Sequence, residues 1–244
     1  AALALARARA ETARELWQGR YVWEVVGADP AWGPISPTGL VVRDTLSARM
    51  HPRMAIPALA AAVVARGGEI VAEAPDAGAV VWATGWQGLA QLSDHFGKPV
   101  GAPIKGQSAV LRHEAAALPQ VFAGGVHVVP HADGTVAIGS TTERAFTDGA
   151  ACDGLLDDVI AAARAACPAL ANAPVVGRWA GLRPRAKSRS PMLGPWPGRP
   201  GHFVANGGFK IGFGLAPMVG QALAALVLDR ADAIPAGFRV EANL

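Results

Sequence analysis

The residues with the clearest chemical potential lie in two stretches of the C-terminal third of the chain. Arg183 stands in Ala180-Gly181-Leu182-Arg183-Pro184, and Lys210 stands in the glycine-rich stretch 206–217. A planar guanidinium can bind a carboxylate through two parallel hydrogen bonds, whereas a lysine ammonium is a compact charge without that geometry. The two cations therefore indicate recognition of an anionic group. Each also has an ordinary interpretation, Arg183 as part of a solvated basic run and Lys210 as a stem that packs beside the loop.

The glycine-rich stretch joins an expected strand, residues 202–205, to an expected helix that ends near Leu228. Its glycines let the backbone turn tightly and approach a ligand closely. Pro217 suits a first helical turn, and the free N–H groups at a helix start favour an electron-rich group. This arrangement is common in α/β proteins, so by itself it indicates a ligand site only weakly.

Other reactive groups give no recognisable set. No Ser–His–Asp set or carboxylate pair can be singled out, and Cys152 and Cys167 lack the CxxC spacing of a metal site. Apolar residues between the two cysteines recur at helical spacing, which would hold the thiols roughly 20 Å apart, beyond disulfide reach. We therefore expect reduced cysteines, a cytoplasmic location and no metal site.

The composition predicts a folded chain with a large core. The sequence has 244 residues, of which 51% are hydrophobic and 17% charged, so it can form one domain or two interleaved ones. We expect no membrane span, because the apolar runs are interrupted by Arg, Gly or Pro before reaching about 18 residues. A net charge of +3 does not favour a nucleic-acid partner.

The N-terminal part combines helices with short strands. We expect a helix over residues 1–18, two strands or extended segments within residues 20–47, and a helix from Pro52 to Gly67, unless Pro57 marks its true first turn. Further strands are expected at residues 69–72 and 79–83, the second apolar on both faces, as a central parallel strand would be. The second strand runs into Thr84-Gly85.

The following segment has a different character. Residues 104–112 alternate as in a half-buried strand, and residues 126–130 and 135–139 flank a good hairpin turn. The helix between the cysteines and a strand over residues 175–179 complete the segment. Several strands in series with one helix predict an antiparallel sheet inserted into the α/β part.

Several motifs together resemble the D-amino-acid oxidase and glycine oxidase family of FAD-dependent oxidoreductases. They are A-T-G after the strand 79–83, K-G-Q before a strand, V-P-H-A-D-G-T-V-A-I-G-S-T-T-E, W-A-G-L-R-P and G-G-F-K-I-G, and they cover most of residues 40–229 in the family's order. The resemblance implies a mixed α/β fold, a glutathione-reductase-like FAD-binding layer with an inserted antiparallel substrate domain. It also implies non-covalent FAD.

The resemblance divides the chain into five parts. A helix and connecting strands (1–49) lead toward the substrate domain, residues 50–95 and 181–230 belong to the FAD-binding domain, residues 96–180 form the antiparallel substrate-binding domain, and residues 231–244 are a tail. The family's leading G-x-G-x-x-G unit, which holds the FAD pyrophosphate, has no counterpart here. We therefore expect the FAD layer to be incomplete and this chain alone to bind FAD weakly or not at all.

The resemblance also assigns the site residues. Arg183 would hold the substrate carboxylate. Lys210 replaces an arginine of glycine-oxidase relatives, and His127 stands where relatives often have tyrosine, so both are candidate substrate residues. Lys210 could equally be structural, and for His127 the interpretation as a packed strand histidine is preferred. The expected flavin contacts are Thr84, Gly85, Gly208, Phe209, Lys210, Ile211, Gly212, Phe213 and Gly214.

The implied reaction is oxidation of an amino acid or related amine. Hydride would pass from Cα–H to flavin N5 and give an imine, with oxygen or another electron acceptor re-oxidising the flavin, so no catalytic acid or base is singled out. Two alternatives stay open: a non-catalytic remnant without flavin binding of its own, and a flavoenzyme that modifies a tRNA side chain. The sequence indicates no oligomeric state.

Overall fold

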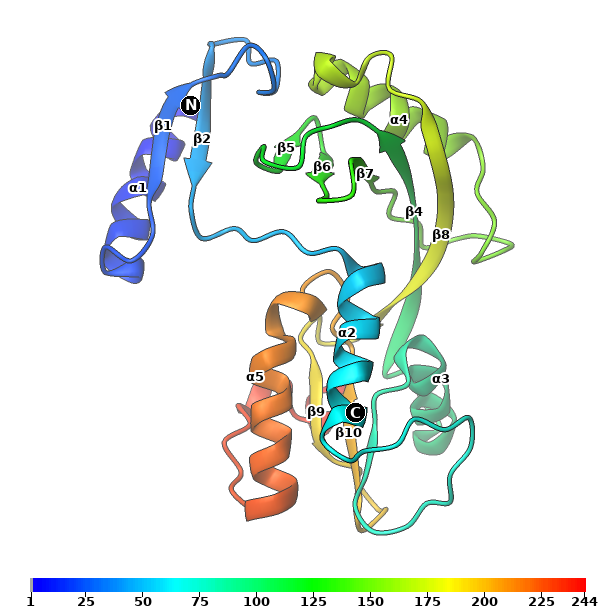
Figure 1. The fold of residues 1–244 in the computed structure, drawn as a ribbon. Helices are drawn as coiled ribbons and strands as arrows, with labels where there is room; N and C mark the ends of the chain where they lie inside the picture. The colour runs from blue at the N-terminus through cyan, green and yellow to red at the C-terminus, as the bar shows by residue number, and fades with distance from the viewer. Residues whose placement is uncertain (1) are drawn as a thin grey trace. The chain divides into compact units, whose positions relative to one another are not determined.

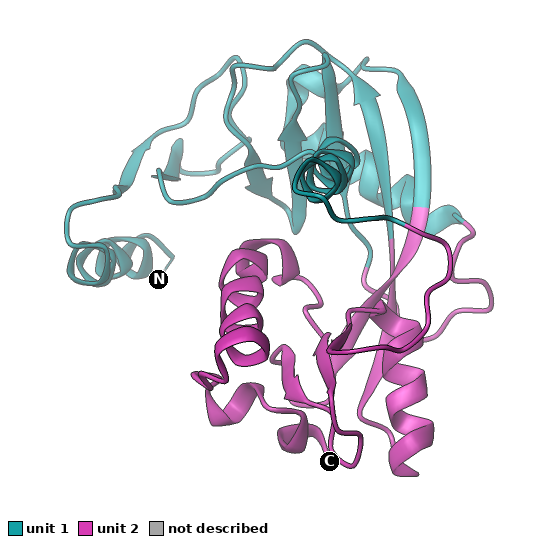
Figure 2. Cartoon of the chain, turned by 60° about the horizontal axis from the view of Figure 1, so that its bottom comes forward, with its two compact units in different colours: residues 1–70, 107–141, 152–179 teal, residues 71–106, 142–151, 180–244 magenta. Residues whose placement is uncertain are grey.

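A computed structural model describes residues 2–244, and the chain divides into two compact units (Figures 1 and 2). Unit 1 contains the residues up to Ile70, residues 107–141 and residues 152–179, and unit 2 contains residues 71–106, 142–151 and 180–244. Two twelve-residue strands, β4 (Gly101–Arg112) and β8 (Val175–Ala186), contribute residues to both units. The mixed α/β fold expected from the sequence is confirmed.

Unit 1 begins with helix α1 (Ala2–Trp17) beside an antiparallel hairpin of β1 (Trp23–Gly27) and β2 (Leu40–Asp44). The less exposed face of α1 carries the residues at helical spacing Leu3, Ala6, Ala10, Ala13 and Trp17, of which Ala13 is buried. The Trp23 indole Nε1 donates to the Ala6 carbonyl at 3.1 Å, which ties the hairpin to the helix. Helix α2 (Pro52–Ala65) follows.

The main core of unit 1 lies between a sheet and helix α4 (Gly154–Ala166). The five-stranded sheet has the order β5-β6-β7-β4-β8, where β5 is Val121–Ala123, β6 Val126–Pro130 and β7 Thr135–Gly139. The apolar face of α4 covers alternate strand residues, as helical and strand periodicities require. Members of this core are Ala109, Leu111, Val128, Val136, Ile138, Leu156, Val159, Ile160 and Ala163.

A buried polar pair fixes the start of α4 to the sheet. The Gln107 side chain is fully buried, and its Nε2 donates to Asp153 Oδ1 while its Oε1 accepts from the Asp153 backbone N–H, both at 2.8 Å. Asp153 also caps α4 by accepting from the Leu155 N–H at 3.0 Å. Residues Pro168–Leu170 form a 3₁₀ turn after the helix.

Unit 2 contains a three-stranded sheet with a helix on each face. Its order is β3-β10-β9, where β3 is Val80–Trp82, β10 His202–Asn206 and β9 Met192–Pro195. Val204 packs in a core with α3 (Gly85–Phe96), and the next residue, Ala205, packs against α5 (Gly212–Ala224). Successive strand residues point to opposite faces, so the two helices cover different faces. Later turns are Ala225–Asp229, Ala236–Phe238 and Val240–Asn243.

Strands β3 and β10 pair in parallel within one sheet. The strand expected at residues 79–83, now β3, was predicted to be central and buried on both faces, and this prediction is wrong for the described residues. There β3 is an edge strand and Val81 is 43% exposed, because no described element packs over that side chain.

Other boundaries also differ from the sequence analysis. Residues 69–72 form no strand in the described chain, since Ile70 and Val71 are exposed and no strand pairs with them. Helix α2 begins at Pro52, as expected, with Pro57 inside it. Helix α5 begins at Gly212, so Pro217 lies inside it and not in its first turn. Strand β8 continues beyond residue 179 through the G-L-R-P motif, and α3, β5 and β9 were not predicted.

One helical segment reaches the length and composition of a membrane span, contrary to the expectation that none would. It covers Gly212–Asp229, with a mean hydropathy of 1.4, and 11% of it is buried. The expectation treated Gly and Pro as interruptions, but the helix runs through Pro217 and Gly220. A core helix passes the same test, so this is weak evidence for a span.

The core of unit 1 gives a direct stability test. Leu156→Ala should lower the free energy of unfolding by about 2–5 kcal/mol, because the side chain is fully buried and its removal leaves a cavity. Leu155→Ala is the matched control, since Leu155 is 48% exposed on the same helix turn, and should change stability by no more than about 0.5 kcal/mol. If urea unfolding gives the same loss of unfolding free energy for both variants, this assignment of the core is contradicted.

Candidate active site

The G-L-R-P arginine lies in unit 2 where β8 passes β4. The Arg183 guanidinium packs directly over Gly106, and a Cβ atom added at residue 106 would collide with it. Its Nη1 donates to the Lys105 carbonyl at 3.4 Å. Burial lowers the pKa of Arg183 from its ordinary value and the Glu143 carboxylate opposes that shift, so the side chain stays cationic at neutral pH.

A buried ion pair lies beside this arginine. Lys105 Nζ is 3.4 Å from Glu143 Oε2, and the two side chains are only 4% and 10% exposed. Their backbones also pair, Lys105 N donating to Glu143 O at 3.0 Å and Glu143 N to Lys105 O at 2.9 Å. With Arg183 included, two cations face one carboxylate.

Positive side chains also surround a cavity in unit 2. The cationic pocket has a volume of about 240 Å³ and is lined by Ile104, Thr142, Arg144, Arg185, Arg189, Phe209 and Lys210. Four of these seven residues are cations and none is an acid. Arg183 and Arg185 are two residues apart in β8, so they lie on the same face of that strand. Lys210 Nζ donates to the Thr142 hydroxyl at 3.0 Å, which holds Lys210 at the rim of the pocket.

The glycine-rich loop contacts the G-L-R-P segment directly. Phe209 N donates to the Pro184 carbonyl at 3.0 Å, and Gly208 forms an isolated bridge with Arg185. Gly207 and Phe209 adopt φ of +73° and +44°, the left-handed region that glycine enters without strain. The two motifs that carry the substrate and flavin assignments thus belong to one group in the fold.

The Thr84-Gly85 turn joins the same edge of the sheet. Because β3 and β10 are parallel, the turn after β3 and the glycine loop after β10 both follow carboxyl ends of strands, where α/β sheets bind ligands. Asn206, which is buried, donates from Nδ2 to the Gly85 carbonyl at 2.8 Å. Its Oδ1 accepts from Gly207 N at 2.7 Å, so this one amide connects the two turns.

The start of α5 offers unsatisfied donors. Helix α5 begins at Gly212. Its N-cap residue, Ile211, makes no side-chain hydrogen bond to the first turn of the helix. The N–H groups of Gly212, Phe213 and Gly214 therefore have no acceptor within the helix. A Cβ at Gly212 or Gly214 would meet open space, which leaves room for a ligand against this backbone.

His127 belongs to unit 1, whereas the other expected site residues belong to unit 2. It is an exposed residue of β6 whose ring centroid lies 4.5 Å from that of Phe122. Sequence reasoning missed several unit 2 residues that shape the site: Lys105, Gly106, Glu143, Arg185 and Asn206. The K-G-Q motif contained two of them, but its glycine gave no sign of its long-range contact with Arg183.

Comparison with known proteins decides the family. A family model described as FAD dependent oxidoreductase matches residues 2–226. The chain belongs to this family of FAD-dependent oxidoreductases. Family membership makes FAD the cofactor to test against the glycine loop and the Thr84-Gly85 turn.

Individual relatives of this family agree. The chain is 36% identical over 152 residues to a glycine oxidase of Pseudomonas aeruginosa, covering 57% of this chain and 42% of that protein. A glycine oxidase structure from Geobacillus kaustophilus has a TM-score of 0.59 at 30% identity and covers 66% of this chain and 45% of that one. A Bacillus cereus glycine oxidase structure shares the fold over 93% of this chain and 70% of that one, with a TM-score of 0.73 at 18% identity. The chain spans less than half the length of the first two relatives.

The contact between Gly106 and Arg183 can be tested by substitution. Gly106→Ala should lower the free energy of unfolding by about 1–3 kcal/mol, because the added methyl must displace a packed guanidinium. Gly181→Ala, on the same strand as Arg183, is the control: nothing lies within 4 Å of its added Cβ. If thermal unfolding of the two variants is alike, the close packing of Arg183 on Gly106 is refuted.

Proposed function

We propose that this chain forms the substrate side and part of the flavin side of an FAD-dependent oxidoreductase that oxidises amino acids or related amines. The observation that carries the proposal is the Arg183 guanidinium, held over Gly106 and next to the flavin-type glycine loop. In this proposal residues 50–95 and 181–230 serve the FAD-binding domain and residues 96–180 the substrate-binding domain.

The role of Arg183 rests on charge and geometry. Arg183 is a partly buried cation beside the Lys105–Glu143 ion pair, and its attraction for a substrate carboxylate is stronger there than in water. The guanidinium can bind that carboxylate through two hydrogen bonds and so fix the direction of the Cα–N bond. Fixing this direction is what the protein contributes to the reaction rate.

The residues around the glycine loop fit FAD. Open N–H groups at the start of α5, the glycines at 208, 212 and 214 and the Thr84-Gly85 turn would hold an electron-rich ring edge. Phe209 and Ile211 would add apolar contact. When bound, FAD supplies a hydride acceptor for the Cα–H of a neutral amine, which leaves as an imine.

Lys210 and His127 have supporting roles in the proposal. Lys210, at the rim of the cationic pocket, would balance negative charge on the reduced cofactor or meet the substrate acid group, without the bidentate grip of an arginine. His127 would line the substrate side in the complete protein. Oxygen or another acceptor would re-oxidise the flavin.

A cytoplasmic location is part of the same proposal. Both cysteines are free, Cys152 exposed and Cys167 buried, which suits a reducing compartment. Burial raises the pKa of the Cys167 thiol, so it stays protonated and unreactive. We interpret Gly212–Asp229 as a core helix of the complete protein, because its first turn forms the proposed flavin contact.

The proposal predicts a substrate-dependent effect of Arg183→Leu in the FAD-loaded protein that contains this chain. For an α-amino acid, kcat/KM should fall by about 3–5 kcal/mol of transition-state stabilisation, because a desolvated carboxylate loses its partner. For an amine without a carboxylate, kcat/KM should fall much less, and the flavin absorbance of the protein should be unchanged.

Arg178→Leu is the matched control for this measurement. Arg178 lies on the same strand, is 44% exposed and pairs with Asp157, so its loss should leave kcat/KM for both substrates intact. If Arg183→Leu lowers kcat/KM by the same factor for both substrates, Arg183 serves folding or flavin geometry and the carboxylate assignment is wrong. If no flavin binds to the complete protein, the proposed function itself fails.

A further inference from the structure

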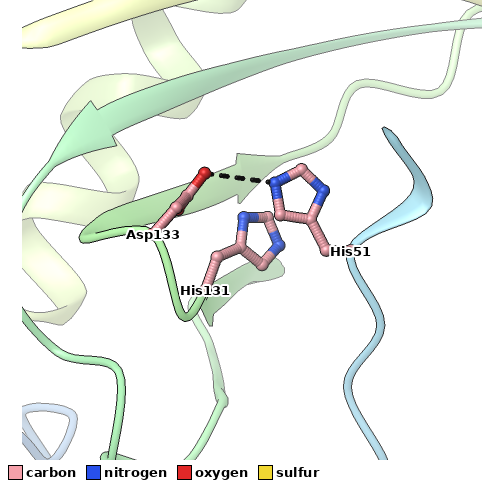
Figure 3. A group of neighbouring side chains, drawn as sticks. All are labelled: His51, His131 and Asp133. Carbon is pink, nitrogen blue, oxygen red and sulfur yellow. Dashed lines mark ion pairs between the residues drawn. The ribbon is translucent and has the colours of Figure 1, made fainter. Parts of the chain in front are cut away.

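Three metal-ligating side chains meet in unit 1, outside the site described above. His51 precedes α2, and His131 and Asp133 belong to the turn between β6 and β7; Figure 3 shows them facing one another. One potential ligand atom from each lies within 4.8 Å of the others. His51 Nε2 is 3.4 Å from Asp133 Oδ2, and the two imidazole centroids are 4.0 Å apart.

One nitrogen of this group has no hydrogen-bond partner in the described chain. Nδ1 of His51 is buried and has no hydrogen-bond partner among the residues that the structure describes. A buried polar atom without a partner costs free energy of desolvation, and an ion at the site is one of the physical explanations for such an atom. An ion held with Asp133 satisfies this nitrogen only when the ring turns Nδ1 toward the carboxylate, because Nε2 is the nitrogen that faces Asp133 Oδ2 at 3.4 Å.

A second layer of contacts orients two of the three ligands. The Thr135 hydroxyl donates to Asp133 Oδ1 at 2.6 Å, and it lies 3.4 Å from His131 Nδ1. The second oxygen of this carboxylate, Oδ2, faces His51 Nε2 at 3.4 Å. Such outer contacts hold ligand rings and carboxylates in position in established metal sites.

We propose that His51, His131 and Asp133 bind a divalent transition ion of the zinc type. Two imidazoles and one carboxylate are a common ligand set for Zn²⁺, at roughly 2.0–2.2 Å from the ion. The stacked rings turn toward each other on binding, a side-chain rotation that brings the donors together. This site is independent of the proposed oxidation of amines.

The surroundings indicate where the remaining coordination position opens. His51, His131 and Asp133 line a cavity of about 710 Å³ over the sheet face opposite α4, together with Arg53 and Trp179. Three protein ligands leave a fourth tetrahedral position for water or a small anion. The ion joins the segment before α2 to the β6–β7 turn, so binding stabilises this part of unit 1.

Titration of the metal-free protein with Zn²⁺ tests the proposal. Isothermal calorimetry should find one Zn²⁺ per chain, with a rise in the thermal midpoint. His51→Gln, His131→Gln and Asp133→Asn should each weaken binding by on the order of 100-fold or more, because loss of even an outer contact costs about 10–100-fold. Thr135→Val should fall within that smaller range.

Two variants outside the group are the controls. His95→Gln on α3 and Cys152→Ser should keep the affinity of the unchanged protein, since neither residue belongs to the group. Bound Co²⁺ should give visible d–d bands without a thiolate charge-transfer band, as expected for nitrogen and oxygen ligands. Binding that survives His51→Gln with His131→Gln, or that is lost in Cys152→Ser, would overturn the proposal, as would absence of Zn²⁺ binding by the unchanged protein.

Discussion

The packing of the Arg183 guanidinium over Gly106 is the contact on which the candidate site depends. Any side chain at residue 106 would occupy the volume of the guanidinium. With Arg183 in place, β8 continues through Pro184 and Arg185, and its backbone receives Phe209 from the glycine loop. The absence of a side chain at Gly106 thus allows Arg183 to pack against β4, next to the segment that the glycine loop contacts.

The second organising feature of unit 2 is the shared edge of its parallel strands. Strand β3 and strand β10 end side by side, and Asn206 joins their following turns through both ends of its amide. The backbone groups near residues 84–85 and 206–214 are therefore held by hydrogen bonds before any ligand binds. A site preorganised in this way loses less conformational entropy when it binds its ligand.

Much of the fold could be predicted from the sequence because its periodicities are strong. The spacing of Ala6, Ala10 and Ala13 identified the inner face of α1, and the hairpin of β6 and β7 followed from its turn residues. The motifs also indicated the family. The prediction of a strand at residues 69–72 was wrong, because these apolar residues have no pairing partner in the described chain. Local composition cannot reveal whether such a partner exists.

The candidate site was only partly predictable for a similar reason. Arg183 and Lys210 stand in recognisable motifs. Glu143, Gly106 and Asn206 also stand in recognised motifs, but their roles depend on contacts between positions far apart in the sequence, which the motifs do not reveal. His131 and Asp133 were recognised only as turn residues, because their neighbour His51 comes from a different part of the chain. Ligand sets assembled by tertiary packing leave no spacing pattern to detect.

The alternation of the two units along the chain affects how the protein is made. Strand β3 pairs only with β10 among the described strands, and the amide contact between their ends joins residues 121 positions apart. At a synthesis rate of about 5–20 residues per second, roughly 6–24 s separate the two partners on the ribosome. During that interval Val80, Val81 and Trp82 lack their β10 partner, so the hydrogen-bonding edge that faces β10 stays unpaired until the later strand has been made.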